Sequence, residues 1–222
     1  MEILNLGSHR IGVRFPEKGL CKGKNPAILL NDGELIEQLN LRTERAVLVG
    51  VYPNNRLSEY TPWPEPAIRP GTPDFGGRLG QYHKELTNEI LPTLIDEYAL
   101  DTEKLAYGGY SLGGLAATMS LWETDAFAAV FSLCGSFWYP GVADFIEEHV
   151  PKNYSAQVYL QNGIREGEGH NNRLCDAYSY AQRVHTALQA TCGAKTVLDD
   201  YGHHDRQSER LNAALRWVER VL

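Results

Sequence analysis

The stretch Gly109-Tyr110-Ser111-Leu112-Gly113 matches the pattern G-x-S-x-G. In this pattern a serine occupies a sharp turn between a strand and a helix, and the flanking glycines keep side chains out of the crowded corner. The serine hydroxyl then points into solvent, and the backbone N–H of the next residue, Leu112, can help to bind an oxyanion. The pattern therefore predicts that Ser111 is a nucleophile.

The residues on either side of the motif supply the context that it needs, because the motif alone also occurs by chance. Before it, residues 104–107 form a short, largely apolar run that predicts a buried strand. After it, residues 115–122 predict a helix with small residues at its start. Since strand, turn and helix is the arrangement in which this motif carries a nucleophile, we expect Ser111 to be one rather than a structural serine.

Short apolar runs alternate with helical patterns along the rest of the chain. Strands are expected at residues 2–6, 11–15, 27–30, 46–51, 127–134, 158–160 and 195–198. Helices are expected at residues 34–41, 81–100 with a kink at Pro92, 173–190 and 206–222. This alternation predicts an α/β fold with a mostly parallel sheet and helices on both faces. Active groups then belong at the carboxyl ends of the strands.

Length and composition limit the class of protein. The chain has 222 residues, of which 43% are hydrophobic, and this suits a single domain spanning residues 1–222. A net charge of −7 and the absence of a basic run argue against nucleic acid as a partner. No apolar stretch is long enough for a membrane span, and residues 1–15 do not form a secretory signal. We therefore expect a cytoplasmic protein with no membrane partner.

The four cysteines form no C-x-x-C pair. This spacing predicts reduced structural thiols rather than disulfides or a metal site.

A serine hydroxyl is a poor nucleophile near neutral pH, so it needs a base and a third group that orients the base. In this context the chain order is serine, acid, histidine. His203 and His204 lie just beyond the last expected strand, where the base should be, and His204 is slightly favoured. His185 falls within an expected helix and is predicted to be a surface residue, whereas His170 lies in a polar loop and can touch substrate.

The acid should follow the expected strand at residues 158–160. Glu166 is closest to the end of that strand and is the first choice. Glu168 and Asp176 also follow in the right order, and a Ser–His pair without an acid is the remaining alternative.

The second oxyanion donor is expected in the turn Asn31-Asp32-Gly33-Glu34, which follows the strand at residues 27–30. The N–H of Gly33 is the first choice and that of Glu34 the next. An ordinary Asp-Gly turn without this role is an equally weighted alternative.

Residues 53–80 form a long, proline-rich segment that we expect to pack over the active site. Arg56, Tyr60 and Trp63 in this segment, and Trp138 further along, are candidate substrate-binding residues. The aromatic side chains can line a site for an aromatic or catecholate acyl group, and Arg56 can bind an anionic ligand. The alternatives, which are favoured, are ordinary packing and an ion pair between Arg56 and Glu59.

Taken in order, six stretches make the chain resemble the putative-esterase branch of the α/β-hydrolases. They are Leu29-Leu30-Asn31-Asp32-Gly33, residues 55–63 (NRLSEYTPW), residues 109–114 (GYSLGG), Cys134-Gly135-Ser136-Phe137-Trp138, Gly163-Ile164-Arg165-Glu166 and Gly202-His203-His204-Asp205. The resemblance covers residues 11–222. This branch includes enterochelin (siderophore) esterases, esterase D-like proteins and some feruloyl esterases.

The resemblance implies the α/β-hydrolase fold and a serine carboxylic-ester hydrolase that works through an acyl-enzyme. It implies Ser111 as nucleophile, His203 or His204 as base and Glu166 as acid, with oxyanion donors at Leu112 and Gly33. The substrate it implies is a small or aromatic ester, with siderophore esters among the candidates, and no metal or organic cofactor is needed. An acyltransferase on the same residues and a non-catalytic binding protein are the alternatives, and a homo-oligomer is left open.

Overall fold

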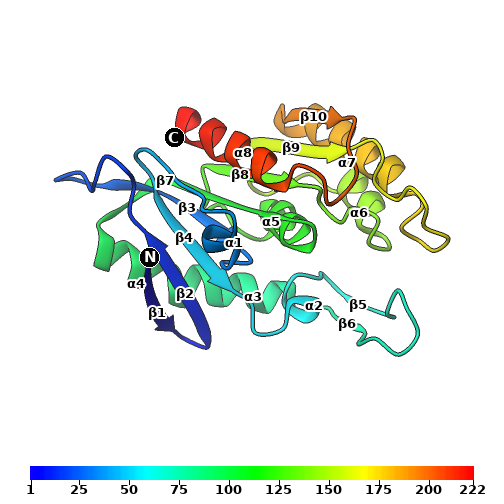
Figure 1. The fold of residues 1–222 in the computed structure, drawn as a ribbon, viewed down its shortest axis with the longest axis horizontal. Coiled ribbons are helices and arrows are strands. Elements are labelled where there is room, and N and C mark those ends of the chain that lie inside the picture. The colour runs from blue at the N-terminus through cyan, green and yellow to red at the C-terminus, as the bar shows by residue number, and fades with distance from the viewer.

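The computed structural model describes residues 1–222, and a twisted eight-stranded sheet forms its centre (Figure 1). The strands, in their order across the sheet, are β1 (Glu2–Leu6), β2 (His9–Arg14), β4 (Val47–Tyr52), β3 (Asn25–Asn31), β7 (Leu100–Tyr110), β8 (Ala129–Leu133), β9 (Gln157–Gly163) and β10 (Lys195–Asp199). The pairs β1–β2 and β2–β4 are antiparallel, whereas every pair from β4 to β10 is parallel. The expected α/β class with a mostly parallel sheet is therefore confirmed.

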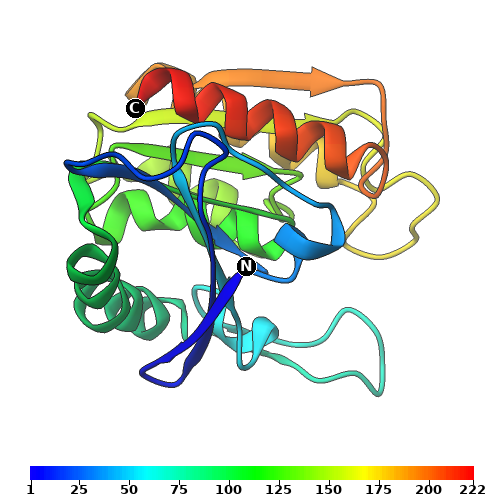
Figure 2. The same cartoon turned by 60° about the vertical axis from the view of Figure 1, so that its left-hand side comes forward.

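Helices cover both faces of this sheet, which explains why its inner strands are continuous apolar runs. Along β3, Leu29 joins one buried cluster while Ile28 and Leu30 join another, because successive side chains of a strand point to opposite faces. The larger cluster packs under α3 (Leu79–Glu85), α4 (Leu91–Tyr98), α5 (Leu112–Glu123), α6 (Val142–Glu148) and α7 (Ala177–Cys192). The smaller cluster packs under α1 (Leu35–Gln38) and α8 (Gln207–Val221), and Figure 2 shows α8 in front of the sheet, running along its strands.

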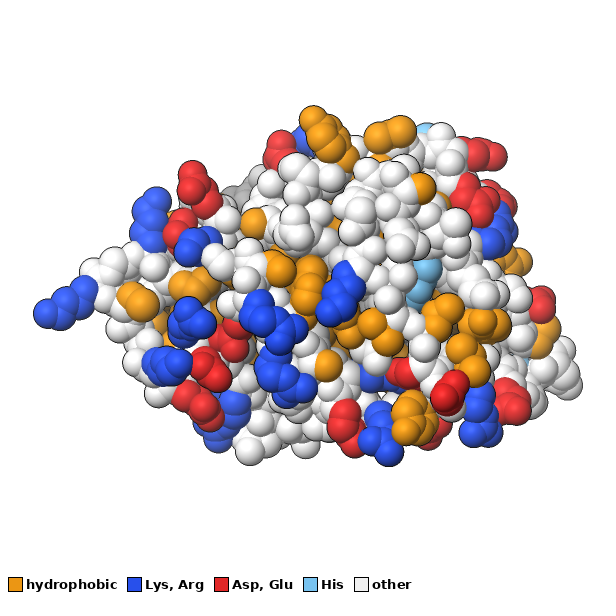
Figure 3. Space-filling view, turned by 90° about the horizontal axis from the view of Figure 1, so that it is seen from above, with side chains coloured by type: hydrophobic (Ala, Val, Ile, Leu, Met, Phe, Trp, Pro, Cys, Tyr) orange, Lys and Arg blue, Asp and Glu red, His pale blue; other side chains and the backbone are white.

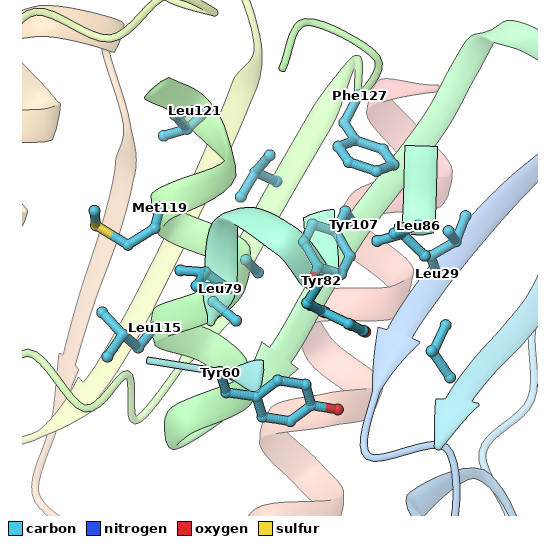
Figure 4. Close-up of a cluster of buried hydrophobic side chains, with 14 of the residues drawn as sticks. Leu29, Tyr60, Leu79, Tyr82, Leu86, Tyr107, Leu115, Met119, Leu121 and Phe127 are labelled. Atoms are coloured by element: carbon cyan, nitrogen blue, oxygen red, sulfur yellow. The ribbon is translucent and has the colours of Figure 1, made fainter. Parts of the chain in front are cut away.

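Aromatic side chains fill the larger cluster between α3 and the sheet. Figure 4 shows Tyr60, Tyr82 and Tyr107 among leucines of β3, α3 and α5. The rings of Tyr60 and Tyr82 are tilted against each other with centroids 5.4 Å apart, and all three tyrosines are at most 1% exposed. Their hydroxyl groups must therefore find partners inside the protein.

The carboxyl ends of the parallel strands meet at one edge of the sheet. Leu133 at the end of β8 is paired with Tyr110 at the end of β7, and Asp199 at the end of β10 is paired with Gly163 at the end of β9. The loops that leave β7, β9 and β10 carry Ser111, Glu166 and His203. Residues that lie far apart in the sequence are thus brought to the same edge.

The helix expected at residues 81–100 is interrupted. A π-helical turn, η1 (Leu86–Ile90), separates α3 from α4, and Pro92 occupies the first turn of α4. Pro92 has no backbone N–H to donate, and the π-helical turn before it leaves this position without the need for one. Ala99 ends α4 in a left-handed conformation, and Leu100 already belongs to β7.

Several other boundaries differ from the pattern-based prediction. The helix expected at residues 34–41 is the single turn α1, and the helix expected from residue 173 begins at Ala177. The segment at residues 53–80 contains α2 (Arg56–Glu59) and a short ribbon of β5 (Pro64–Glu65) and β6 (Phe75–Gly76). Figure 2 shows the ribbon and its loop as an arm that reaches away from the sheet.

No helix combines the length and apolar character that crossing a bilayer requires. On the face shown in Figure 3, Lys and Arg side chains lie on the left, in the centre and along the right-hand edge, with Asp and Glu side chains and apolar side chains between them. This face therefore carries charges of both signs.

We expect Gly108→Ala to destabilise the protein by about 1–3 kcal/mol, because overpacking a dense core forces neighbours to shift. A Cβ at this position in β7 would lie 2.1 Å from Cε1 of Phe131, which is fully buried. Urea unfolding of the variant and the wild type measures the difference. Gly80→Ala in α3 is the control, since its Cβ would lie 3.6 Å from the nearest atom. Equal stability of Gly108→Ala and wild type would contradict the prediction.

Candidate active site

Ser111 has the strained backbone that a nucleophile elbow requires. Its φ of 60° and ψ of −122° lie in a region that residues with a side chain rarely adopt. Its N–H donates to the carbonyl of Leu133 at 2.9 Å. A Cβ on Gly109 would lie 2.5 Å from the carbonyl carbon of Gly113, so no side chain fits there. The backbone conformation of Ser111 and the close packing at Gly109 are therefore those that the G-x-S-x-G pattern predicts.

A continuous hydrogen-bonded chain runs from this serine to a buried carboxylate. The hydroxyl Oγ of Ser111 lies 3.0 Å from Nε2 of His203, and Nδ1 of the same ring lies 3.0 Å from Oε2 of Glu166. Both contacts are within hydrogen-bond distance. The geometry allows His203 to take a proton from Ser111 while Glu166 orients the ring.

His204 is the neighbour of this histidine and is not hydrogen bonded to Ser111, so the slight preference for His204 from the sequence is corrected. Its ring meets that of His203 edge-on with centroids 4.9 Å apart. The hydroxyl of Tyr110 donates a hydrogen bond to the carbonyl of His203, and this contact helps to determine which of the two histidines turns toward Ser111. It joins two residues 93 positions apart, and therefore could not be read from the local sequence.

The environment of Glu166 keeps its carboxyl group ionised. The residue is 4% exposed, and its Oε1 accepts hydrogen bonds from the N–H of Gly163 at 2.7 Å and from Asn162 at 3.2 Å. Burial alone would raise the pKa of this carboxyl, but the hydrogen bond and charge of His203 and the N–H of Gly163 outweigh burial and lower it.

The two alternative acids lie elsewhere. Glu168 pairs with Arg165 at 2.7 Å, and both side chains are more than half exposed. Asp176 is exposed at the residue before α7. Neither contacts His203 in the way that Glu166 does.

His185 contradicts the prediction that it is a surface residue, since it is 4% exposed. Its Nε2 lies 3.0 Å from Oδ1 of Asn162, the residue that also donates to Glu166. Burial, the largest cause, lowers the pKa of His185 to about 4, so its ring is neutral at pH 7. His185 shares the side of α7 that faces the sheet with Val184 and Leu188, and this spacing in the sequence could have indicated that it is buried.

Arg210 was also missed by sequence reasoning, and it supports the loop that carries His203. Its side chain is 2% exposed and pairs with Asp199 at the end of β10. The guanidinium donates to the carbonyl of Gly202 at 3.0 Å and to the hydroxyl of Tyr110 at 3.2 Å. The signal was its spacing within α8, because Arg210 precedes the buried Ala214 and Val218 by four and eight residues.

One cluster of potential metal ligands lies at this site, namely Cys134, Glu166 and His203, whose ligand atoms all lie within 4.8 Å of one another. Arg210 donates to Sγ of Cys134 at 2.8 Å, and a guanidinium so close opposes a cation. Burial is also the largest cause of a raised pKa at the Cys134 thiol, so it stays protonated. The cluster is therefore better suited to holding the imidazole than to binding a metal ion.

The oxyanion donors differ in part from expectation. Leu112 is the first residue of α5, so its N–H has no partner within the helix. Gly33 is corrected as a donor, because its N–H donates to the carbonyl of Val51 at 3.0 Å. A Cβ on Gly33 would lie 2.7 Å from the backbone of Gly50, so close packing explains this glycine. The next N–H, that of Glu34, makes none of the protein's backbone hydrogen bonds outside helices and strands.

Two clefts share Ser111 among their lining residues. The larger, of about 480 Å³, is lined by Trp138, Ile68, Arg69, Leu174 and loop residues around Glu166 and His203. The smaller, of about 270 Å³, is lined by Asp32, Glu34, Arg56 and Gln207 among others. His204 borders both clefts. A substrate can therefore extend to either side of the serine.

The four candidate substrate-binding residues divide into two pairs. Trp138 and Arg56 line the clefts, whereas Tyr60 is fully buried and Trp63 lines neither. The indole N–H of Trp63 donates to the carbonyl of Pro140 at 3.0 Å, which directs this ring into the protein. Tyr60 and Trp63 are thus corrected as substrate contacts in this structure.

The expected ion pair between Arg56 and Glu59 is also wrong. Arg56 binds both carboxylate oxygens of Asp32, at 2.8 and 2.9 Å. Glu59 instead lies 3.4 Å from Nε2 of the buried His9. Of residues 53–80, which were expected to pack over the active site, Arg56, Ile68 and Arg69 border the two clefts at Ser111.

Comparison with known proteins identifies relatives along almost the whole chain. A family model described as "Putative esterase" matches residues 9–217. "Uncharacterized protein YbbA" of Bacillus subtilis (strain 168) is 29% identical in an alignment of 204 residues, and the match covers 83% of this chain and 82% of that protein.

Solved structures with similar folds include several hydrolases. The BES protein from Bacillus cereus has a TM-score of 0.74 at 20% identity, over 95% of this chain and 90% of that one. An IroE-like serine hydrolase from Shewanella oneidensis has a TM-score of 0.72 at 18% identity, over 96% and 74%. The siderophore hydrolase EstA from Aspergillus nidulans has a TM-score of 0.70 at 17% identity, over 96% and 90%. These likenesses confirm the α/β-hydrolase fold.

The pH dependence of stability should reveal the ionised state of Glu166. Because its pKa in the folded protein is lowered from 4.5, the unfolded chain binds this proton first as the pH falls. The stabilisation is therefore present above 4.5 and is lost as the pH falls through the lower folded value. Glutamine does not ionise, so the gap in unfolding free energy between wild type and Glu166→Gln should shrink on acidification.

Urea unfolding from neutral pH down to about pH 3 measures this gap. Glu168→Gln, at an exposed position, serves as the control and should change stability little at neutral pH. A gap for Glu166→Gln that stays constant over the whole range would contradict the lowered pKa.

Proposed function

This chain belongs to the putative esterase family, and from that premise we propose that it hydrolyses carboxylic esters through a serine nucleophile and an acyl-enzyme. The observation that carries the proposal is the hydrogen-bonded chain Ser111–His203–Glu166, with both contacts at 3.0 Å. Serine, base and orienting acid are the parts that such a mechanism needs.

In the first half of the reaction, Oγ of Ser111 attacks the carbonyl carbon of the ester while Nε2 of His203 accepts the hydroxyl proton. The carbonyl oxygen becomes an oxyanion, and the N–H groups of Leu112 and Glu34 are the proposed donors to it. His203 then gives the proton to the leaving alcohol as the carbon–oxygen bond breaks. An acyl group remains on Ser111.

In the second half, His203 takes a proton from a water molecule, which attacks the acyl carbon. The oxyanion forms again at the same donors. As it collapses, the bond between the acyl carbon and Oγ of Ser111 breaks, His203 returns the proton to Oγ, and the carboxylic acid leaves. Throughout, Glu166 accepts the Nδ1–H of His203 and stabilises the imidazolium that forms. Its lowered pKa keeps it ionised for this role at neutral pH.

The larger cleft supports an ester with an aromatic or other flat acyl group. Trp138 lines it together with Ile68 and Leu174, and the guanidinium of Arg173 lies 5.7 Å from the Trp138 ring centre on one side. A volume of about 480 Å³ suits a small-molecule ester. Several proteins of similar fold are siderophore hydrolases, which is consistent with a siderophore-type ester as substrate.

Variants of the three proposed catalytic residues test the mechanism. We expect Ser111→Ala and His203→Ala to lower kcat by about 10⁴-fold or more, because the nucleophile and base act as one unit. Glu166→Gln should cost about 10²- to 10⁴-fold, since the imidazole loses its orienting charge. His204→Ala is the matched control and should stay within about tenfold of wild type. Release of 4-nitrophenol from 4-nitrophenyl acetate and butyrate, with labelling by a fluorophosphonate probe, measures the effects.

An inactive His204→Ala together with an active His203→Ala would overturn the assignment of the base. A wild type that neither cleaves esters nor reacts with the probe would overturn the serine mechanism itself.

Substitution of Trp138 tests the acyl preference. Trp138→Leu should raise KM for an aromatic ester, such as methyl ferulate, by about fivefold, because a stacking surface worth about 1 kcal/mol is lost. The KM for 4-nitrophenyl acetate should change little, because an acetyl group is too small to reach the ring. Equal changes in KM for both esters would contradict a role of Trp138 in acyl recognition.

A further inference from the structure

The turn that carries the proposed donor Glu34 is held in part by its own backbone, since the N–H of Leu35 donates to the carbonyl of Asp32 at 2.9 Å, and in part by side chains from distant segments. Asp32, at its start, has a φ of 56°, a left-handed conformation that is unfavourable for most residues with a side chain. An oxyanion donor works only if it is fixed before the reaction begins.

One set of contacts comes from the segment at α2. Arg56 donates to both carboxylate oxygens of Asp32, through Nε at 2.8 Å and Nη2 at 2.9 Å. The same Nη2 donates to the carbonyl of Tyr110 at 3.3 Å, the residue directly before Ser111. The hydroxyl of Tyr60 accepts the N–H of Asp32 at 3.0 Å. Arg56 thus connects the turn to the elbow.

A second contact comes from the end of β3. Asn31, which is fully buried, donates from Nδ2 to the carbonyl of Gly113 at 2.9 Å. Its Oδ1 accepts hydrogen bonds from the hydroxyls of Tyr82 at 2.7 Å and Tyr107 at 3.0 Å. The turn is therefore tied to carbonyl groups on both sides of Ser111, by Arg56 before it and by Asn31 after it.

We propose that Arg56 is a positioning residue that sets the oxyanion turn against the elbow through Asp32, and that it does not serve as an anion-binding substrate contact. The inference rests on the proposed serine mechanism. The carboxylate of Asp32, which is 7% exposed, neutralises the guanidinium. Little net charge is left for an anionic substrate in the smaller cleft. The pair instead supplies two hydrogen bonds from one guanidinium to one carboxylate, which together fix the orientation of Asp32.

This role makes a different kinetic prediction from substrate binding. If the turn shifts, the donor misses the oxyanion of the transition state, while the ground-state ester binds as before. Misplacement by about 1 Å can cost about 10²-fold in rate. Arg56→Gln and Asp32→Asn should each lower kcat by about 10- to 100-fold, with KM within about twofold of wild type.

The test compares a neutral ester, 4-nitrophenyl acetate, with an anionic one, 4-nitrophenyl hemisuccinate. Each variant should lose kcat by the same factor for the two esters. The double variant should be as active as the less active of the two single variants, because the two residues act through one contact. Arg56→Lys keeps the charge but not the fork of donors, so it should recover activity only in part. Arg183→Gln, in an exposed ion pair between α6 and α7, is the control and should match wild type.

A transition-state analogue separates positioning from a loss of folded protein. The inhibition constant of a trifluoromethyl ketone, which forms an oxyanion on Ser111, should rise by the factor by which kcat/KM falls. A smaller fraction of folded enzyme would leave that constant unchanged. If Asp32→Asn unfolds, the comparison of Arg56→Gln with Arg56→Lys and the inhibition constants still decides.

The inference is overturned if Arg56→Gln raises KM for the hemisuccinate alone with kcat unchanged, or if Arg56→Lys restores full activity, since either result means that charge attraction matters. Activity of Asp32→Asn equal to wild type would also overturn it. Failure of the mechanism looks different, because wild type and Ser111→Ala would then be equally inert toward both esters and the ketone.

Discussion

The backbone of Ser111 is held in a conformation that costs energy, and the surrounding structure is built to maintain it. Such a conformation persists only where neighbouring contacts impose it. The N–H of Ser111 donates to the carbonyl of Leu133 in the next strand. A Cβ on Gly109 would meet the backbone of Gly113, and a Cβ on Gly113 would meet Asn31, so neither side of the turn accepts a side chain. Because the turn stands at the end of β7, in the middle of the sheet, the whole parallel sheet supports it.

Polar groups buried beneath the elbow complete the site, and they come from distant parts of the chain. Arg210 in α8 joins Asp199, Tyr110 and the loop that carries His203. Asn162 and His185 stand behind Glu166 in a similar way. Buried charges and amides are costly unless they are paired, so each set has a defined geometry and limits how far the proposed base and acid can move.

Two aromatic residues that were candidates for substrate binding, Tyr60 and Trp63, make contacts inside the protein instead. Tyr60 is fully buried and its hydroxyl accepts the N–H of Asp32, while Trp63 is anchored to Pro140. Their sequence context cannot distinguish an aromatic ring in a cleft from one in the core, because both environments favour the same residue types. Trp138 was recognisable by the same reasoning, and it does line the larger cleft.

The sequence by itself determined the α/β class, the strands that form the centre of the sheet, the sharp turn at Ser111, and the placement of Glu166 and of the His203–His204 pair after later strands. These follow from local patterns, since apolar runs and a glycine-flanked serine act through neighbours in the chain. Only the tertiary structure decided that His203 rather than His204 faces Ser111, that Gly33 serves packing, and that Arg56 pairs with Asp32. Each of these depends on contacts between segments far apart in sequence, which local spacing does not encode.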